Sequence, residues 1–134
     1  MRLHIKPKTE YLHVLVTGPF DAAHGPGPAA EIYRAAREHG LLRILVDCRP
    51  LSGDIGVMER FRGAGYVAEN DQRLIRIAFV IPESQLWHDH FLENALVNRG
   101  VHARVVTDPD SAMKWLRVTD TPEDLHEVAP PLAV

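Results

Sequence analysis

The stretch from Leu41 to Arg49, LLRILVDCR, decides the fold of this chain. Its aliphatic residues end at the polar triplet Asp47, Cys48 and Arg49, which a Pro-Leu-Ser-Gly sequence follows. A short apolar run bounded by turn residues is typical of a strand that is covered on both faces of its sheet. Open α/β sheets bind ligands beyond the carboxyl ends of their strands, so we expect a site next to this triplet.

Segments with the pattern of strands or helices lie on both sides of this run. Strands are expected over residues 2–6, 11–17, 74–81 and 101–107, and helices over residues 29–40, 57–70, 87–100 and 108–116. The second helix is marked by Val57, Phe61, Ala64 and Ala68. The first link is hairpin-length and the later ones are helix-length, which favours one antiparallel pair followed by parallel crossovers. The prediction is a single α/β domain of order ββαβαβαβα, with a mixed, mostly parallel sheet flanked by helices.

The composition and net charge of the chain exclude some classes of function. The chain has 134 residues, a net charge of −3, one cysteine and 46% hydrophobic residues. We expect a domain over residues 1–117 and a C-terminal tail over residues 118–134 with one short helix, which Thr121 and Pro122 could begin. The acidic balance and the scattered arginine pairs argue against nucleic-acid binding. No segment is patterned as a signal peptide or membrane span, so a cytoplasmic protein is expected.

Three motifs carry a family resemblance. They are LVDCR at residues 45–49, IAFV at residues 77–80 and VVTDPDSAMKWL at residues 105–116. With the element order, they resemble the STAS domain, and especially the stand-alone SpoIIAA-like proteins related to bacterial anti-sigma-factor antagonists. The resemblance implies a non-enzymatic interaction module. It also implies an Asp-Ser pair with a phosphorylated serine at the start of the second helix, where this chain has Asp54, Ile55 and Gly56, and Ser52 is a poor substitute.

The candidate binding residues fall in the loop after the central strand. Asp47, Arg49, Ser52 and Asp54 lie where backbone polar groups need partners and where such sheets place their ligands. We expect this loop and the helix that begins near Val57 to contact a partner protein or a small, lipophilic molecule. On this hypothesis, Arg49→Ala and Asp54→Ala weaken binding and change the melting temperature little.

Aromatic side chains make a second candidate surface. Trp87 and Phe91 share one face of the third helix, and Trp115 and Leu116 follow on the last helix. Such a set more often belongs to a core, but it could line an apolar pocket or the seam of a homodimer.

A hydrolase or transferase that uses Asp47, Cys48 and Arg49 is the alternative function. Cys48 would need a cationic neighbour to become a thiolate, and fast alkylation near neutral pH would distinguish it from a core cysteine. No cofactor and no metal are expected. Because His88 and His90 are two residues apart on a helix, they point away from each other.

Overall fold

The computed structural model describes residues 1–53, 55–72 and 74–119, without the side chains of residues 86–89. Asp54, the side chain of Trp87 and the tail helix expected near Thr121 lie outside this described part.

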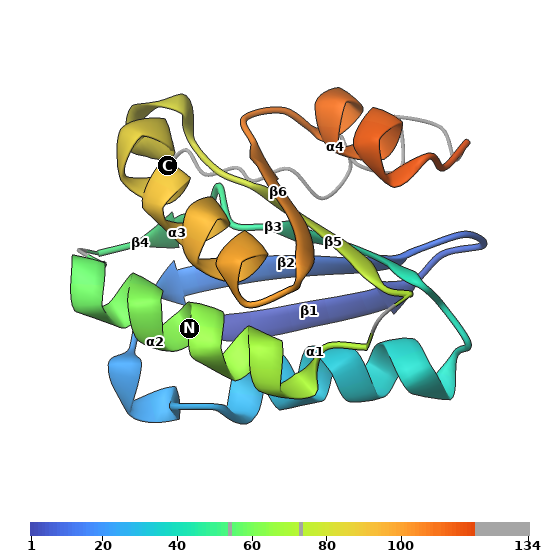
Figure 1. Ribbon diagram of the computed structural model, residues 1–134, viewed down its shortest axis with the longest axis horizontal. Helices are drawn as coiled ribbons and strands as arrows, with labels where there is room; N and C mark the ends of the chain where they lie inside the picture. The colour runs from blue at the N-terminus through green and yellow to red at the C-terminus, as the bar shows by residue number, and fades with distance from the viewer. Residues whose placement is uncertain (54, 73, 120–134) are drawn as a thin grey trace.

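The centre of the molecule is a mixed sheet (Figure 1). Its strands β1 (Arg2–Pro7), β2 (Leu12–Pro19), β3 (Arg43–Asp47), β5 (Arg76–Val80) and β6 (His102–Val106) are ordered β1-β2-β3-β5-β6. β1 pairs with β2 antiparallel, and every other pairing of the described strands is parallel, as predicted. The expected run from Leu41 to Asp47 is therefore the middle strand. The sequence did not predict β4 (Leu51–Ser52), which pairs with the end of β2.

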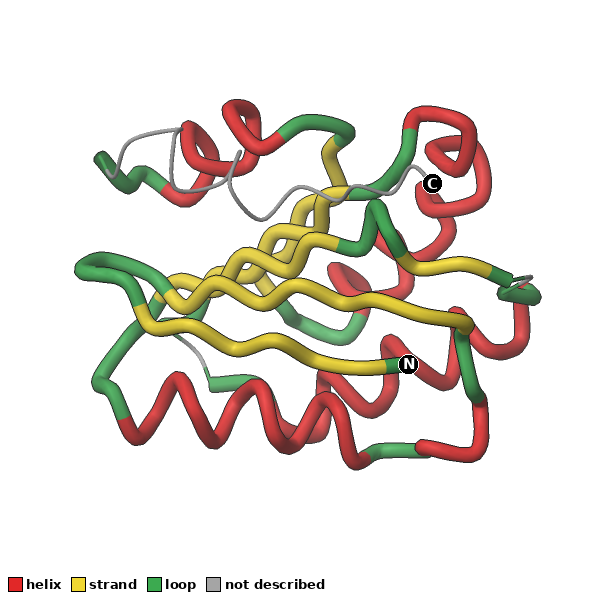
Figure 2. Tube along the Cα trace, turned by 180° about the vertical axis from the view of Figure 1, so that it is seen from behind, coloured by secondary structure: helices red, strands yellow, loops and turns green. Residues whose placement is uncertain are grey.

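Helices cover both faces of the sheet. They are α1 (Gly27–Glu38), α2 (Val57–Asn70), α3 (Leu86–Asn98) and α4 (Pro109–Leu116), with short 3-10 helices η1 (Ala22–His24) and η2 (Glu83–Gln85). α1, α2 and α3 pack against one face through the larger core, and α4 packs alone against the other. Figures 1 and 2 show α1 and α4 on opposite sides of the strands.

The ends of the helices are set by local chemistry. The Asp108 side chain accepts hydrogen bonds from the backbone N–H and the hydroxyl of Ser111, both at 2.8 Å, and Pro109 opens α4. Gly40 and Gly100 follow α1 and α3 with φ of 64° and 85°, a conformation that favours glycine. The first helix begins at Gly27, two residues before the expected start.

The second helix predicted from Val57, Phe61, Ala64 and Ala68 is present as α2, but its apolar residues do not all face the core. Val57 and Phe61 are 53% and 45% exposed. Ala64 is buried, and so is Arg60.

Candidate functional site

The end of β3 sends successive side chains to opposite faces of the sheet. Val46 and Cys48 belong to the face covered by α1, α2 and α3, and both line a cavity there. Asp47 therefore points to the α4 face, because side chains alternate along a strand. Cys48 therefore lies beside the cavity on one face of the sheet, whereas Asp47 lies on the face that α4 covers.

Asp47 and Arg49 form a close ion pair. The Arg49 Nε and Nη2 donate to the two carboxylate oxygens of Asp47 at 2.9 and 2.7 Å, and the Arg49 backbone N–H donates to Oδ1 at 3.1 Å. The Asp47 carboxylate is almost fully buried. Its hydrogen bonds raise the pKa of Arg49. The guanidinium is therefore held by Asp47, on the face away from the cavity that Cys48 lines.

The loop after β3 folds back toward β2. The Leu51 N–H donates to the Cys48 carbonyl at 3.0 Å, and the Phe20 N–H donates to the Ser52 carbonyl at 2.8 Å, so β4 extends the end of β2. Ser52 is exposed and Ile55 is partly buried. The Arg60 guanidinium donates to the Ile55 carbonyl and, at 3.1 Å, to the Gln85 side chain. This buried arginine fixes the segment that leads into α2.

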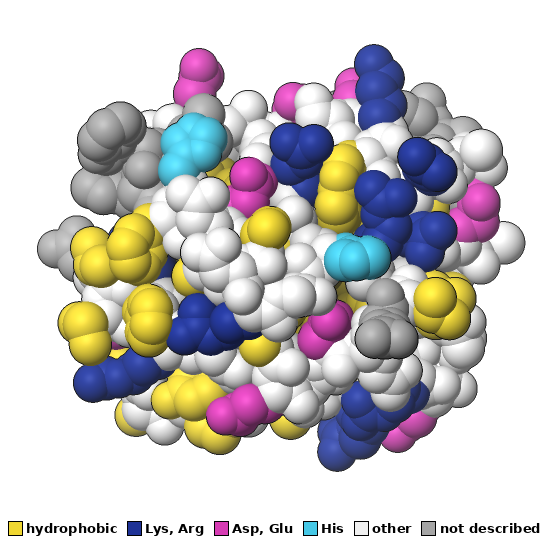
Figure 3. Space-filling model, viewed as in Figure 1, with side chains coloured by type: hydrophobic (Ala, Val, Ile, Leu, Met, Phe, Trp, Pro, Cys, Tyr) yellow, Lys and Arg dark blue, Asp and Glu magenta, His cyan; other side chains and the backbone are white. Residues whose placement is uncertain are grey.

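Large apolar side chains are exposed beside this loop. We call Val57, Met58, Phe61 and Phe91 the α2 patch; their exposed fractions run from 43 to 59%. The Phe61 and Phe91 ring centroids are 6.5 Å apart, so α2 and α3 contribute to one surface. Figure 3 shows hydrophobic side chains gathered at the left, over the beginning of α2. Soluble proteins rarely leave such groups together on a surface without a function.

The aromatic set expected from the sequence is not one surface. Phe91 is on α3, while Trp115 is on α4 at the opposite face of the sheet. The Arg76 guanidinium lies over the Trp115 ring, 4.2 Å from its centroid. Phe91 therefore stays a candidate contact residue through the α2 patch, without Trp115.

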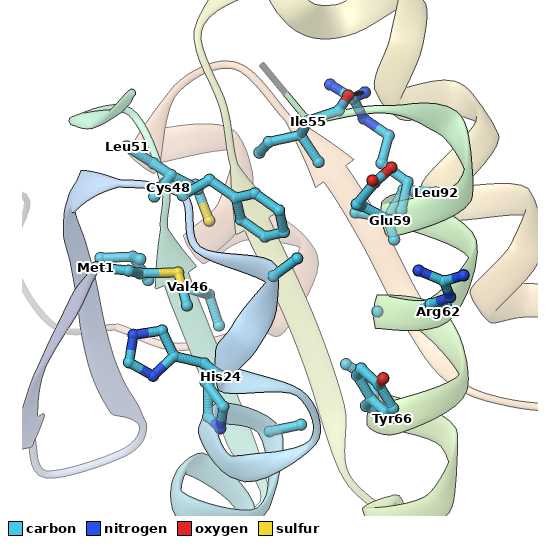
Figure 4. Close-up of a pocket in the computed structure, with 18 of the residues that line it drawn as sticks. Met1, His24, Val46, Cys48, Leu51, Ile55, Glu59, Arg62, Tyr66 and Leu92 are labelled. Atoms are coloured by element: carbon cyan, nitrogen blue, oxygen red, sulfur yellow. Dashed lines mark hydrogen bonds between the residues drawn. The ribbon is translucent and has the colours of Figure 1, made fainter. Parts of the chain in front are cut away.

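An apolar cavity of about 270 Å³ lies between the sheet and the helices α1 and α2 (Figure 4). Its inner wall comes from the sheet, with Val16, Val46 and Phe79, and from α1, with Ile32. Charged and polar groups near it include Asp21, His24, Glu59, Arg62 and Tyr66.

No motif in the sequence indicates this cavity. Its wall is assembled from distant segments, such as Met1 before β1, Leu3 in β1, Phe20 after β2 and Gly63 in α2. The glycine pair Gly63 and Gly65 within the predicted second helix is the one local feature that points to unfilled space there.

A buried histidine lies on the α4 face. His13 is 1% exposed, and its Nε2 has no hydrogen-bond partner among the described residues. Burial lowers the pKa of His13 to about 4, although the negative charge of Asp47 acts to raise it. His13 is therefore neutral near pH 7.

Four arginines that are far apart in the sequence lie near one another in the fold. Desolvation lowers the pKa of Arg76, and the nearby charges of Arg117, Arg43 and Arg104 lower it further. The Arg43 Nε donates to the Leu116 carbonyl at 2.8 Å and so caps α4. The sequence could not show this because parallel strands bring their amino ends together only in the fold.

Within the described ranges, no three His, Cys, Asp or Glu side chains are grouped as a metal site needs. None of the helices there is long and apolar enough to cross a membrane.

Comparisons with known proteins identify the fold. No protein-family model and no curated protein sequence matches the chain. A crystal structure of an anti-sigma factor antagonist from Mycobacterium paratuberculosis is similar with a TM-score of 0.60 and 13% identity, over 87% of this chain and 94% of that one. The anti-sigma factor antagonist SpoIIAA in its unphosphorylated form gives a TM-score of 0.48 and 12% identity, over 89% and 100%. The chain has the α/β fold of anti-sigma factor antagonists, which confirms the resemblance seen in the motifs.

Proposed function

We propose that this protein is a non-enzymatic regulatory module that binds a partner protein through the α2 patch and the loop before α2. The exposed α2 patch is the observation that carries the proposal. Aromatic and methionine side chains are the residues enriched where proteins meet. The loop residues Ser52 and Asp54 are proposed as its polar rim, whereas the Arg49 side chain is held by Asp47 on the α4 face.

The fold suggests the kind of partner. By analogy with the similar anti-sigma factor antagonist, an anti-sigma factor is the partner to test first. Ile55 stands at the position that resembles the phosphorylated serine, and it has no hydroxyl. We infer that binding here is not switched by phosphorylation at this position. A lipophilic ligand, the other occupant considered from the sequence, is supported by the apolar cavity and not by the patch.

The test uses anti-sigma factors from the same source and isothermal titration calorimetry. Met58→Ser and Phe61→Ser should each weaken binding about tenfold or more, because central apolar contacts dominate interfaces. Leu74→Ser is the matched control: Leu74 is 71% exposed, but it follows the far end of the 14-residue α2, roughly 20 Å away. An equal loss in all three variants, or none in the two patch variants, would contradict the proposal.

Sedimentation equilibrium of the same variants tests the homodimer. If the unchanged protein is dimeric and Phe61→Ser makes it monomeric, the patch binds a second copy of the chain, and a separate partner protein is excluded from this surface.

A further inference from the structure

We propose that the cavity between α1, α2 and the sheet binds a small lipophilic acid, with its apolar body inside and its acidic group at Arg62. This site is separate from the α2 patch, and the inference does not depend on the protein partner.

The size and lining of the cavity support an apolar occupant. At roughly 30 Å³ per water molecule, 270 Å³ would hold about nine waters. Walls such as Val16, Ile32, Val46 and Phe79 offer side chains that cannot hydrogen-bond to those waters. An apolar cavity of about 150 Å³ is enough to take up benzene, so this one has room for a larger hydrocarbon body.

Gly63 keeps the cavity open. It lines the cavity from the middle of α2, and a Cβ built on it would meet nothing within 4 Å. Glycine in a helix interior costs roughly 1 kcal/mol relative to alanine. Most helices of a packed core would fill such a space with a side chain. The glycine therefore preserves a volume at a cost to the helix.

The charges at the cavity favour an acidic end group. The Asp21 carboxylate accepts a hydrogen bond from the Ala23 N–H at 2.9 Å and lies 3.7 Å from the His24 ring, so these two side chains are already engaged with the protein. A Cβ on Gly56 would come within 2.5 Å of the Glu59 carboxylate, which places this carboxylate over the amino end of α2. A helix amino terminus offsets a negative charge.

Arg62 is an exposed arginine of the lining, next to the buried Arg60, and Met1 also belongs to the lining. Arg62 makes no hydrogen bond or ion pair in the part of the chain that the structure describes. Its guanidinium can therefore pair with the carboxylate of a bound acid, for which its planar fork is suited.

Decanoate and 1-decanol, titrated calorimetrically below their aggregation concentrations, test the two parts of this proposal. Both should bind the unchanged protein, decanoate more tightly. Gly63→Leu fills the cavity and should abolish both binding events. Gly65→Leu is the matched control: it is the same change in the same helix, also with nothing within 4 Å of its Cβ, at a residue that does not line the cavity. It should bind both compounds as the unchanged protein does.

Arg62→Gln should weaken decanoate about fivefold, the size of a partly exposed ion pair, and leave 1-decanol unchanged. No binding of either compound, or equal binding to the Gly63→Leu and unchanged proteins, would overturn the site. An equal effect of Arg62→Gln on both compounds would overturn the acidic end group. Binding of anti-sigma factors is measured separately, so either proposal can fail alone.

Discussion

Replacing Arg49 with alanine should destabilise the protein, although the sequence alone predicts little change. Arg49 supplies two side-chain donors to Asp47, whose side chain is 1% exposed, and alanine would keep only the backbone N–H. Breaking a fully buried pair costs about 3–5 kcal/mol because one charge is left uncompensated. The Arg49 side chain is 27% exposed, so water can reach the vacated place. We therefore expect a loss of about 2–3 kcal/mol in the free energy of unfolding.

Urea denaturation followed by circular dichroism measures this loss. At about 3 °C per kcal/mol for a domain of this size, the melting temperature should fall by roughly 6–9 °C. The double variant Asp47→Asn with Arg49→Ala completes a cycle, and its loss should be smaller than the sum of the two single losses. Arg49→Lys keeps the charge without the planar fork and should lie between the unchanged protein and Arg49→Ala.

An unchanged denaturation midpoint in Arg49→Ala, or additive losses in the double variant, would refute this reasoning. The result also decides how binding studies are read. If Arg49→Ala is destabilised as expected, its weaker binding is not a measure of contact, and Asp54→Ala becomes the cleaner variant of the loop.

Three further predictions follow from single features. Burial lowers the pKa of His13 from 6.5 to about 4, so the unfolded chain takes up a proton that the folded chain resists; the free energy of unfolding should fall by about 3 kcal/mol between pH 7 and pH 4. His13→Gln should flatten this slope in urea titrations at several pH values, whereas His39→Gln, at an exposed residue, should not. Incubation with an anti-sigma factor kinase and ATP should leave the intact mass of the protein unchanged, because Ile55 has no hydroxyl to accept a phosphate. A phosphate mapped to Ser52 would contradict this prediction. Elemental analysis after dialysis should find less than one zinc, iron or copper per chain; one metal lost on His90→Ala would show that our geometric argument was wrong.

The sequence predicts five of the described strands because each of these carries its own signal, whereas the two-residue β4 does not. The apolar runs at residues 41–47 and 74–81 and the N-cap at Asp108 are local features, and local features survive folding. The cavity and the arginine cluster depend on which strands become neighbours. The ion pair between Asp47 and Arg49 was within reach of the sequence, since the two are two residues apart. What decided its geometry was the turn after β3, which the sequence could not specify.

The composition of α2 is the strongest argument that function lies on this helix. An ordinary surface helix turns large apolar residues inward and charged ones outward. α2 does the reverse at several positions: Arg60 is buried, Gly63 leaves space beneath the helix, and Met58 and Phe61 face solvent. This arrangement lowers the packing density on the side of α2 that faces the sheet and exposes apolar side chains on the side that faces solvent. Local rules tend to be broken where a site requires it, and here the inner side would serve the lipophilic acid and the outer side the partner protein.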